Sequence, residues 1–151
     1  MPIPWRYALR GASLVVLAGV LNLVPVTLPG GGRGSFAAFV YMPLVLLLPR
    51  RWAVFAAAIP AAVTLGVLHH PFLFGVITLE ALWLTWWVHR GGRLVLLADF
   101  AFWAGLGGPV LFLCYWGLSG LPAIRALLEA TEEIGVQVLA VAFAAMVVRH
   151  S

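Results

Sequence analysis

Charged residues are scarce in this chain. They make up 9% of its 151 residues, whereas hydrophobic residues make up 64%. A soluble domain has about 25% charged residues and about half apolar ones. A soluble fold of this length has too little interior to hide so much apolar surface. The composition therefore excludes an ordinary soluble domain and predicts a protein that the lipid bilayer covers.

Lysine is absent, so arginine supplies all nine basic residues and the formal net charge is +4. A basic balance can indicate nucleic-acid binding when the basic residues form a continuous patch. Here the arginines lie at the ends of apolar runs, for example Arg50, Arg51, Arg90 and Arg93. That placement is typical of residues that set membrane topology. We expect no nucleic-acid partner.

Motifs for metals, disulfides and nucleophilic catalysis are also missing. Cys114 is the single cysteine and stands in an apolar run, so it is expected to be a core residue. His69 and His70 are adjacent and would point about 100° apart on a helix, without HExxH or HxH spacing. His89 belongs to the opposite membrane face, roughly 25–30 Å away by helix rise, so one haem cannot bridge them. The sequence identifies no metal site, no cofactor and no enzyme site.

Six apolar stretches are present, which predicts an all-α bundle of six transmembrane helices. The first stretch lacks an A-x-A-like cleavage site and is expected to be a retained span. The second is short for a bilayer core of about 30 Å, so it either begins within the preceding turn or is partly shielded by protein. The predicted spans are 9–28, 36–49, 52–68, 72–88, 94–118 and 134–149, in one domain.

The breaks between these stretches predict the topology. Residues 29–35 form a glycine-rich turn, which lacks the GK[ST] of a phosphate loop. With six spans, seven arginines fall on the side of the two termini, and only Arg33 and Arg125 fall on the other side. The positive-inside rule then places both termini in the cytoplasm, and His69, His70 and 129–133 outside.

Glu80 lies near the middle of the fourth stretch and is the leading candidate for a functional residue. An acid at that depth is costly and is expected to bind a ligand, carry a proton or anchor an ion pair. Packing by a protonated or hydrogen-bonded carboxyl is the alternative. Its possible polar partners are Asn22, Tyr41, Thr64, Thr78 and Gln137.

We expect Glu80 to lie in a pocket between spans one, three, four and five. Asn22 would reach this pocket, His69 and His70 would cap it from outside, and Trp83 and Trp87 would form its floor. Such a site is mostly apolar with a few convergent polar groups, as ligand pockets usually are. The glycine-proline cluster 105–109 predicts a kink or an unwound piece of span five beside it. Asp99 is expected to pair with Arg90 or Arg93 at the cytoplasmic rim.

Several short motifs occur in an order that resembles a known family. They are NLVP at 22–25, HPF at 70–72, LEAL at 79–82, GGP at 107–109 and GLP at 120–122. The pattern is similar to the N-terminal multispan sensor region of bacterial sensor histidine kinases and diguanylate cyclases. The resemblance marks His70, Pro71 and Glu80 as functional positions. It implies two-component or cyclase signalling from the bacterial inner membrane, with output domains that these 151 residues do not hold.

The leading functional hypothesis is therefore a signal-input module that binds a small molecule, including a lipophilic one, between its helices. Two alternatives stay open: the substrate-binding subunit of a small-molecule or vitamin transporter, and a structural assembly protein of the membrane. Kinases and cyclases act as dimers, so the resemblance implies a homodimer. Small-residue faces with Ala57 and Ala61, or with Ala140, Ala144 and Ala145, are the candidate seams.

Overall fold

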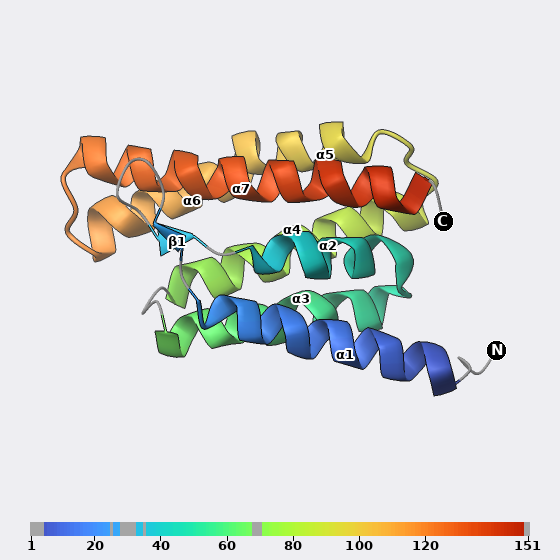
Figure 1. The fold of residues 1–151 in the computed structure, drawn as a ribbon. Coiled ribbons are helices and arrows are strands. Elements are labelled where there is room, and N and C mark those ends of the chain that lie inside the picture. Colours follow the sequence, from blue (N-terminus) through green and yellow to red (C-terminus); the bar gives the residue numbers. More distant parts are fainter. Residues whose placement is uncertain (1–4, 25, 28–32, 35, 68–70, 150–151) are drawn as a thin grey trace.

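A computed structural model describes residues 5–24, 26–27, 33–34, 36–67 and 71–149. Within these ranges the chain is helical apart from one short strand pair (Figure 1), which confirms the all-α prediction. The first four helices are α1 (Trp5–Asn22), α2 (Ala37–Leu47), α3 (Arg50–Val67) and α4 (Pro71–His89). They coincide with the first four predicted stretches, except that α1 ends at Asn22. Pro25 follows shortly after, and the residue before a proline disfavours helical backbone.

The fifth predicted stretch is one continuous helical segment made of four pieces. They are α5 (Val95–Phe102), the π-helical turn η1 (Trp103–Gly107), α6 (Gly108–Leu113) and the π-helical turn η2 (Cys114–Leu118). The last helix, α7, runs from Ala123 to Arg149 without a break. It therefore joins the polar stretch 123–133 to the predicted sixth span.

Three of the six helical segments are long and apolar enough to cross a membrane. They are Phe72–His89, Val95–Leu118 and Ala123–Arg149. The apolar helices Gly11–Asn22 and Ala37–Leu47 are shorter, and α3 begins with two arginines. The expected helix number is thus present, while length and composition support a membrane crossing for three of these segments.

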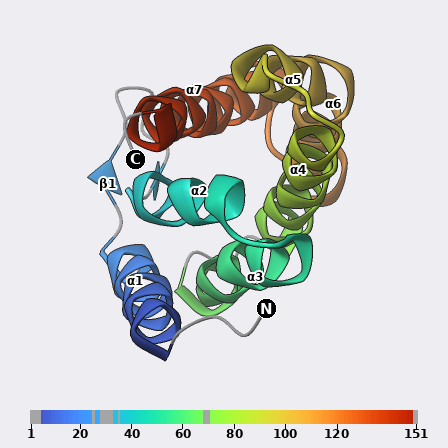
Figure 2. The same cartoon turned by 90° about the vertical axis from the view of Figure 1, so that its right-hand side faces the viewer.

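Helix α2 is the centre of the bundle, and this explains how it can be short. Figure 2 shows α2 surrounded by the other helices, and it packs against α1, α3, α4 and α7. Ala38, Tyr41, Met42 and Val45 are buried along one face, and Phe39, Val40 and Leu46 on its other faces are partly buried against the core. A helix that is apolar all round belongs in an interior. Of the two explanations offered for its length, shielding by protein is the one that fits.

The small-residue faces proposed as dimer seams pack inside the chain instead. Ala57 and Ala61 on α3 and Ala140 and Ala144 on α7 are all fully buried in the single chain. α3 uses its face against α1 and α4, and α7 packs on α2 and α5. Small side chains allow such close approach between helices. These four alanines therefore cannot form a dimer seam, because neighbouring helices of the same chain cover them, whereas Ala145 of the second predicted seam is only partly buried.

The two ends of the bundle differ in charge. In Figure 1, α1 begins and α7 ends at the same end of the molecule, where the α2–α3 and α4–α5 connections also lie. Exposed arginines mark this end: Arg50, Arg51, Arg90, Arg93 and Arg149. The opposite end holds the connection from η2 to α7. We call these the arginine-rich end and the opposite end.

The glycine-rich stretch lies between two short strands. β1 (Val26–Thr27) pairs antiparallel with β2 (Arg33–Gly34), with Val26 opposite Gly34 and Thr27 opposite Arg33. Residues 28–32 lie outside the described ranges.

The cluster 105–109 stays helical, so the unwound piece that its glycines and proline predicted is not found. Widened turns carry the helix through it, and Pro109 occupies an early position of α6, where its missing N–H is tolerated. Gly108 is needed for close packing here. A Cβ added at Gly108 would lie 2.7 Å from the Trp103 carbonyl oxygen and 2.9 Å from the Ile134 side chain of α7.

Substituting Gly108 with alanine should therefore destabilise the fold, by about 1–3 kcal/mol, because backbone and α7 must move apart. Gly105→Ala is the matched control in the same segment, since nothing lies within 4 Å of its added Cβ. That change should be neutral or stabilising by up to about 1 kcal/mol. Equilibrium unfolding in mixed detergent micelles measures both, and equal effects would contradict this packing.

Candidate functional site

Two acidic side chains meet in the interior between α4 and α5. Glu80 lies at the midpoint of α4 and Asp99 lies in α5, and both are 0% exposed. Their carboxyl groups are within hydrogen-bonding reach of each other. The Trp103 indole Nε1 donates a hydrogen bond of 2.8 Å to Glu80 Oε1. We call Glu80, Asp99 and Trp103 the carboxyl cluster.

Local helix geometry places two members of this cluster on one face. Asp99 and Trp103 are four residues apart, so they are neighbours on the helix surface. Trp103 is also the first residue of η1. A π-helical turn shifts the register of the residues that follow it, and such turns often occur at functional sites. Here the turn lies directly beside the buried acids.

A second indole hydrogen bond joins the same two helical segments, and here α4 provides the donor. Trp83 on α4 donates from Nε1 to the Ala98 carbonyl oxygen on α5 over 2.8 Å, whereas Trp103 donates from η1 to α4. Hydrogen bonds of this kind contribute about 0.6–2 kcal/mol each between helices in a membrane. The two bonds together fix the register of α4 against α5.

The carboxyl cluster lacks a counter-charge among the side chains that the structure describes. Glu80 Oε2, Asp99 Oδ1 and Asp99 Oδ2 are buried, and no N–H or hydroxyl group of the described residues donates a hydrogen bond to them. The arginines of α3, of the α4–α5 connection and of α7 are exposed. The ion pair found in the described ranges joins Arg125 to Glu129 at 3.2 Å, near the opposite end. An isolated ionised carboxylate is very costly to bury, so the cluster must be neutralised locally.

Further buried polar groups extend from this cluster toward α7. The Tyr41 hydroxyl on α2 donates to Gln137 Oε1 on α7 over 3.1 Å, and both residues are buried. Glu80 and Asp99 lie within electrostatic range of Tyr41, as does the buried Glu133 of α7. The interior thus contains polar groups from α2, α4, α5 and α7 in one neighbourhood.

The structure separates Asn22 from Glu80. The buried Asn22 side chain on α1 donates from Nδ2 to the Pro60 carbonyl oxygen on α3. α1 packs on α2 and α3, whereas α4, which carries Glu80, packs on α2, α3 and α5. The predicted boundary of spans one, three, four and five is therefore corrected for span one. Asn22 ties α1 to α3.

The remaining predicted site residues have mixed outcomes. His69 and His70 lie outside the described residues. Trp83 and Trp87 stack with centroids 6.4 Å apart, on the side of Glu80 that leads to the arginine-rich end. The Trp87 Nε1 is buried and has no hydrogen-bond partner among the described residues. Trp83 is part of the α4–α5 contact beside the cluster.

The predicted ion pair of Asp99 with Arg90 or Arg93 was wrong. Asp99 faces α4 and is fully buried, whereas both arginines are exposed. The signal that singled out Glu80, an acid within an apolar run, applies equally to Asp99. The pairing with arginine was predicted because Arg90 and Arg93 are close to Asp99 in the sequence. The roles of Trp103 and of the Tyr41–Gln137 bond had no comparable sequence signal.

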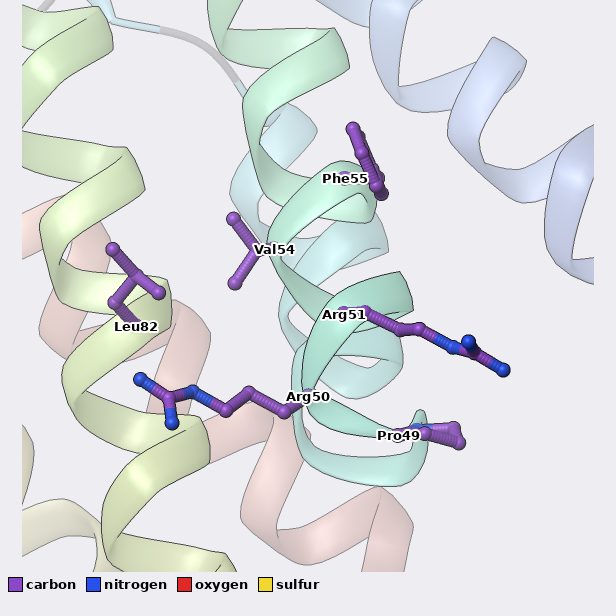
Figure 3. A pocket seen from close by; sticks show the side chains of 6 residues that line it. All are labelled: Pro49, Arg50, Arg51, Val54, Phe55 and Leu82. Carbon is purple, nitrogen blue, oxygen red and sulfur yellow. The ribbon is translucent and has the colours of Figure 1, made fainter.

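The surface of the described ranges includes the following two pockets, and Glu80 lines neither of them. One is a shallow depression of about 590 Å³ at the start of α3, lined by Pro49, Arg50, Arg51, Val54, Phe55 and Leu82 (Figure 3). In this view Arg50 extends toward α4, whereas Arg51 points away from it.

The other pocket, of about 960 Å³, lies between α5 and α7 at the arginine-rich end. Most of its lining is apolar and includes Phe100, Val138 and Met146. Arg93 and Arg149 also line it. We call it the α5–α7 groove. Among the described residues, no group of three His, Cys, Asp or Glu side chains is arranged to hold a metal ion.

Replacing Trp103 with phenylalanine should destabilise the protein by about 1–3 kcal/mol. The change removes the donor to Glu80 and leaves unfilled space in the core. Trp116→Phe is the control, because Trp116 belongs to the same helical segment but is 52% exposed. Equilibrium unfolding in mixed micelles should separate the two variants. A Trp116→Phe effect as large as that of Trp103→Phe would contradict the assigned hydrogen bond.

Comparisons of this chain with protein-family models, with curated proteins and with solved structures give no match.

Proposed function

We propose that this chain is a membrane-embedded signal-input module, which responds to a small molecule between its helices and passes the response along α7. The observation that carries the proposal is the link between the buried acids and α7. The carboxyl cluster lies within electrostatic range of Tyr41, and Tyr41 is hydrogen-bonded to Gln137 of α7. A change of charge at the cluster therefore acts on Tyr41, whose hydroxyl is bonded to the last helix.

The α5–α7 groove is the place where a lipophilic molecule fits this proposal. It is open at the surface, is lined mostly by apolar side chains, and is formed by the two helices that flank the polar interior. Val138, next to Gln137 in the chain, is part of its lining. A ligand seated there would contact α7 directly, and α5 also holds Asp99.

The proposal includes six membrane crossings with both termini in the cytoplasm of a bacterial cell. The arginine-rich end supports this orientation, since basic residues concentrate on the cytoplasmic side. It also includes a homodimer, as signalling proteins of the resembled type require. The buried alanine faces do not supply its interface, so exposed apolar residues would have to form it.

Cysteine labelling in cells tests the orientation. In a Cys114→Ala background, Arg93→Cys should be protected from a membrane-impermeant thiol reagent added outside, whereas Ser119→Cys should react. Both residues are exposed and lie in connections at opposite ends. Gly91 and Gly120 are unsuitable, because their φ values of 78° and 68° favour glycine. External labelling of Arg93→Cys would contradict the six-crossing arrangement.

A chimera tests the signalling role. The chain is joined through a continuous α7 to a cyclase output domain, and cyclic dinucleotide is measured in cells. Glu80→Gln should change the output by about fivefold or more, a typical size for coupling between sites. Glu129→Gln is the control, because it makes the same chemical change in a carboxyl that is paired with the exposed Arg125.

The signalling proposal fails if Glu80→Gln gives the wild-type output in a chimera that is inserted in the membrane and catalytically active. Flux of a small molecule through proteoliposomes, seen only with a partner protein present, would instead favour the transport alternative.

A further inference from the structure

The carboxyl cluster contains two acids, but its described surroundings provide too few donors to stabilise two negative charges. Glu80 and Asp99 are both fully buried, and three of their four carboxyl oxygens receive no N–H or hydroxyl donor from the described residues. The fourth, Glu80 Oε1, accepts the Trp103 N–H. A carboxylate can only accept hydrogen bonds, so two carboxylates in hydrogen-bonding reach would repel each other and leave their inward oxygens unsatisfied.

We propose that Glu80 and Asp99 form a proton-binding site, in which one proton is held between the two carboxyl groups. A protonated acid becomes a donor to the other carboxylate, so a single proton both removes one charge and forms the missing hydrogen bond. The remaining negative charge is spread over the pair, with Trp103 Nε1–H as its fixed donor. Short hydrogen bonds from O–H to a carboxylate are among the strongest in proteins.

The surroundings favour a proton over a larger cation. Both residues are 0% exposed, and neither the α5–α7 groove nor the depression at the start of α3 is lined by them. Two carboxylates and an indole also fall short of the six or so oxygen ligands that a hard cation takes. A proton needs no cavity, and once bound to one carboxyl group it provides a hydrogen-bond donor to the other.

Other titratable groups near the pair are few and do not replace the proton. Tyr41 faces it from α2, and Glu133 of α7 lies within electrostatic range of Tyr41. Tyr115 of η2 lies in range of Glu133 rather than of the pair. The basic groups described on α3 and between α4 and α5 are all exposed, namely Arg50, Arg51, His89, Arg90 and Arg93. None of these groups supplies a positive charge at the cluster.

Proton release during unfolding tests this site without reference to signalling. The detergent-solubilised chain is unfolded with guanidinium chloride at pH 7 in weak buffer, and a pH indicator counts the protons released. Unfolded Asp and Glu side chains are ionised at this pH, so a proton held by the pair must leave. The variant Glu80→Gln/Asp99→Asn has no titratable group at either position but keeps the shape of both. It should release about one proton fewer per chain than the wild type.

Glu133→Gln is the matched control, because it removes a different buried acid at the edge of the same neighbourhood. Proton release by the pair should persist in this variant. A deficit of about two protons in the double variant would mean that both carboxyls are protonated, and no deficit would mean that the pair is ionised or holds a metal cation. Either result overturns the single shared proton.

The pH dependence of unfolding gives a second readout if the double variant does not fold. Because the native pair binds a proton that the unfolded chain does not, the stability of the wild type should fall as the pH rises above neutrality. Glu80→Gln alone and Asp99→Asn alone should flatten this fall, since an amide N–H donates permanently. A wild-type curve that is flat, or one that shifts when sodium replaces potassium at constant pH, contradicts the proposal.

Discussion

The burial of two carboxyl groups between α4 and α5 is the constraint on which the arrangement of this bundle depends. Placing Glu80 and Asp99 in an interior without a counter-charge is unfavourable unless their oxygens find donors. Trp103 supplies one donor, and its position requires the widened turn η1 and the closely packed Gly107 and Gly108. The glycine-proline cluster 105–109 thus positions the Trp103 indole, which donates to Glu80, and does not expose free backbone groups to the acids.

The same constraint explains why the polar residues of the interior are concentrated on particular helices. α2 lies at the centre and brings Tyr41 inward, where its hydroxyl meets Gln137. α1 and α3 are joined by a different contact, between Asn22 and Pro60. The bundle therefore has a polar interior shared by α2, α4, α5 and α7, and a separate tie between α1 and α3.

The proposed proton site and the proposed ligand site differ in their access to the surface. The α5–α7 groove is open and mostly apolar, whereas Glu80 and Asp99 are 0% exposed. Both sites use α5, which contributes Phe100 to the groove and the neighbouring Asp99 to the cluster.

The sequence by itself determined the helical class, the position of the helices and the presence of a costly acid at Glu80. These follow from local properties: long apolar runs, arginines at their ends, and an acid where lipid or protein interior was expected. Tertiary structure decided the partners. Asp99 was assigned to nearby arginines because sequence distance favours local pairs, yet its helix face turns it toward α4. Trp103, Tyr41 and Gln137 do not stand out in the chain, since aromatic and amide residues occur in many apolar helices. Only the packing of the helices around α2 brings them together with the two acids.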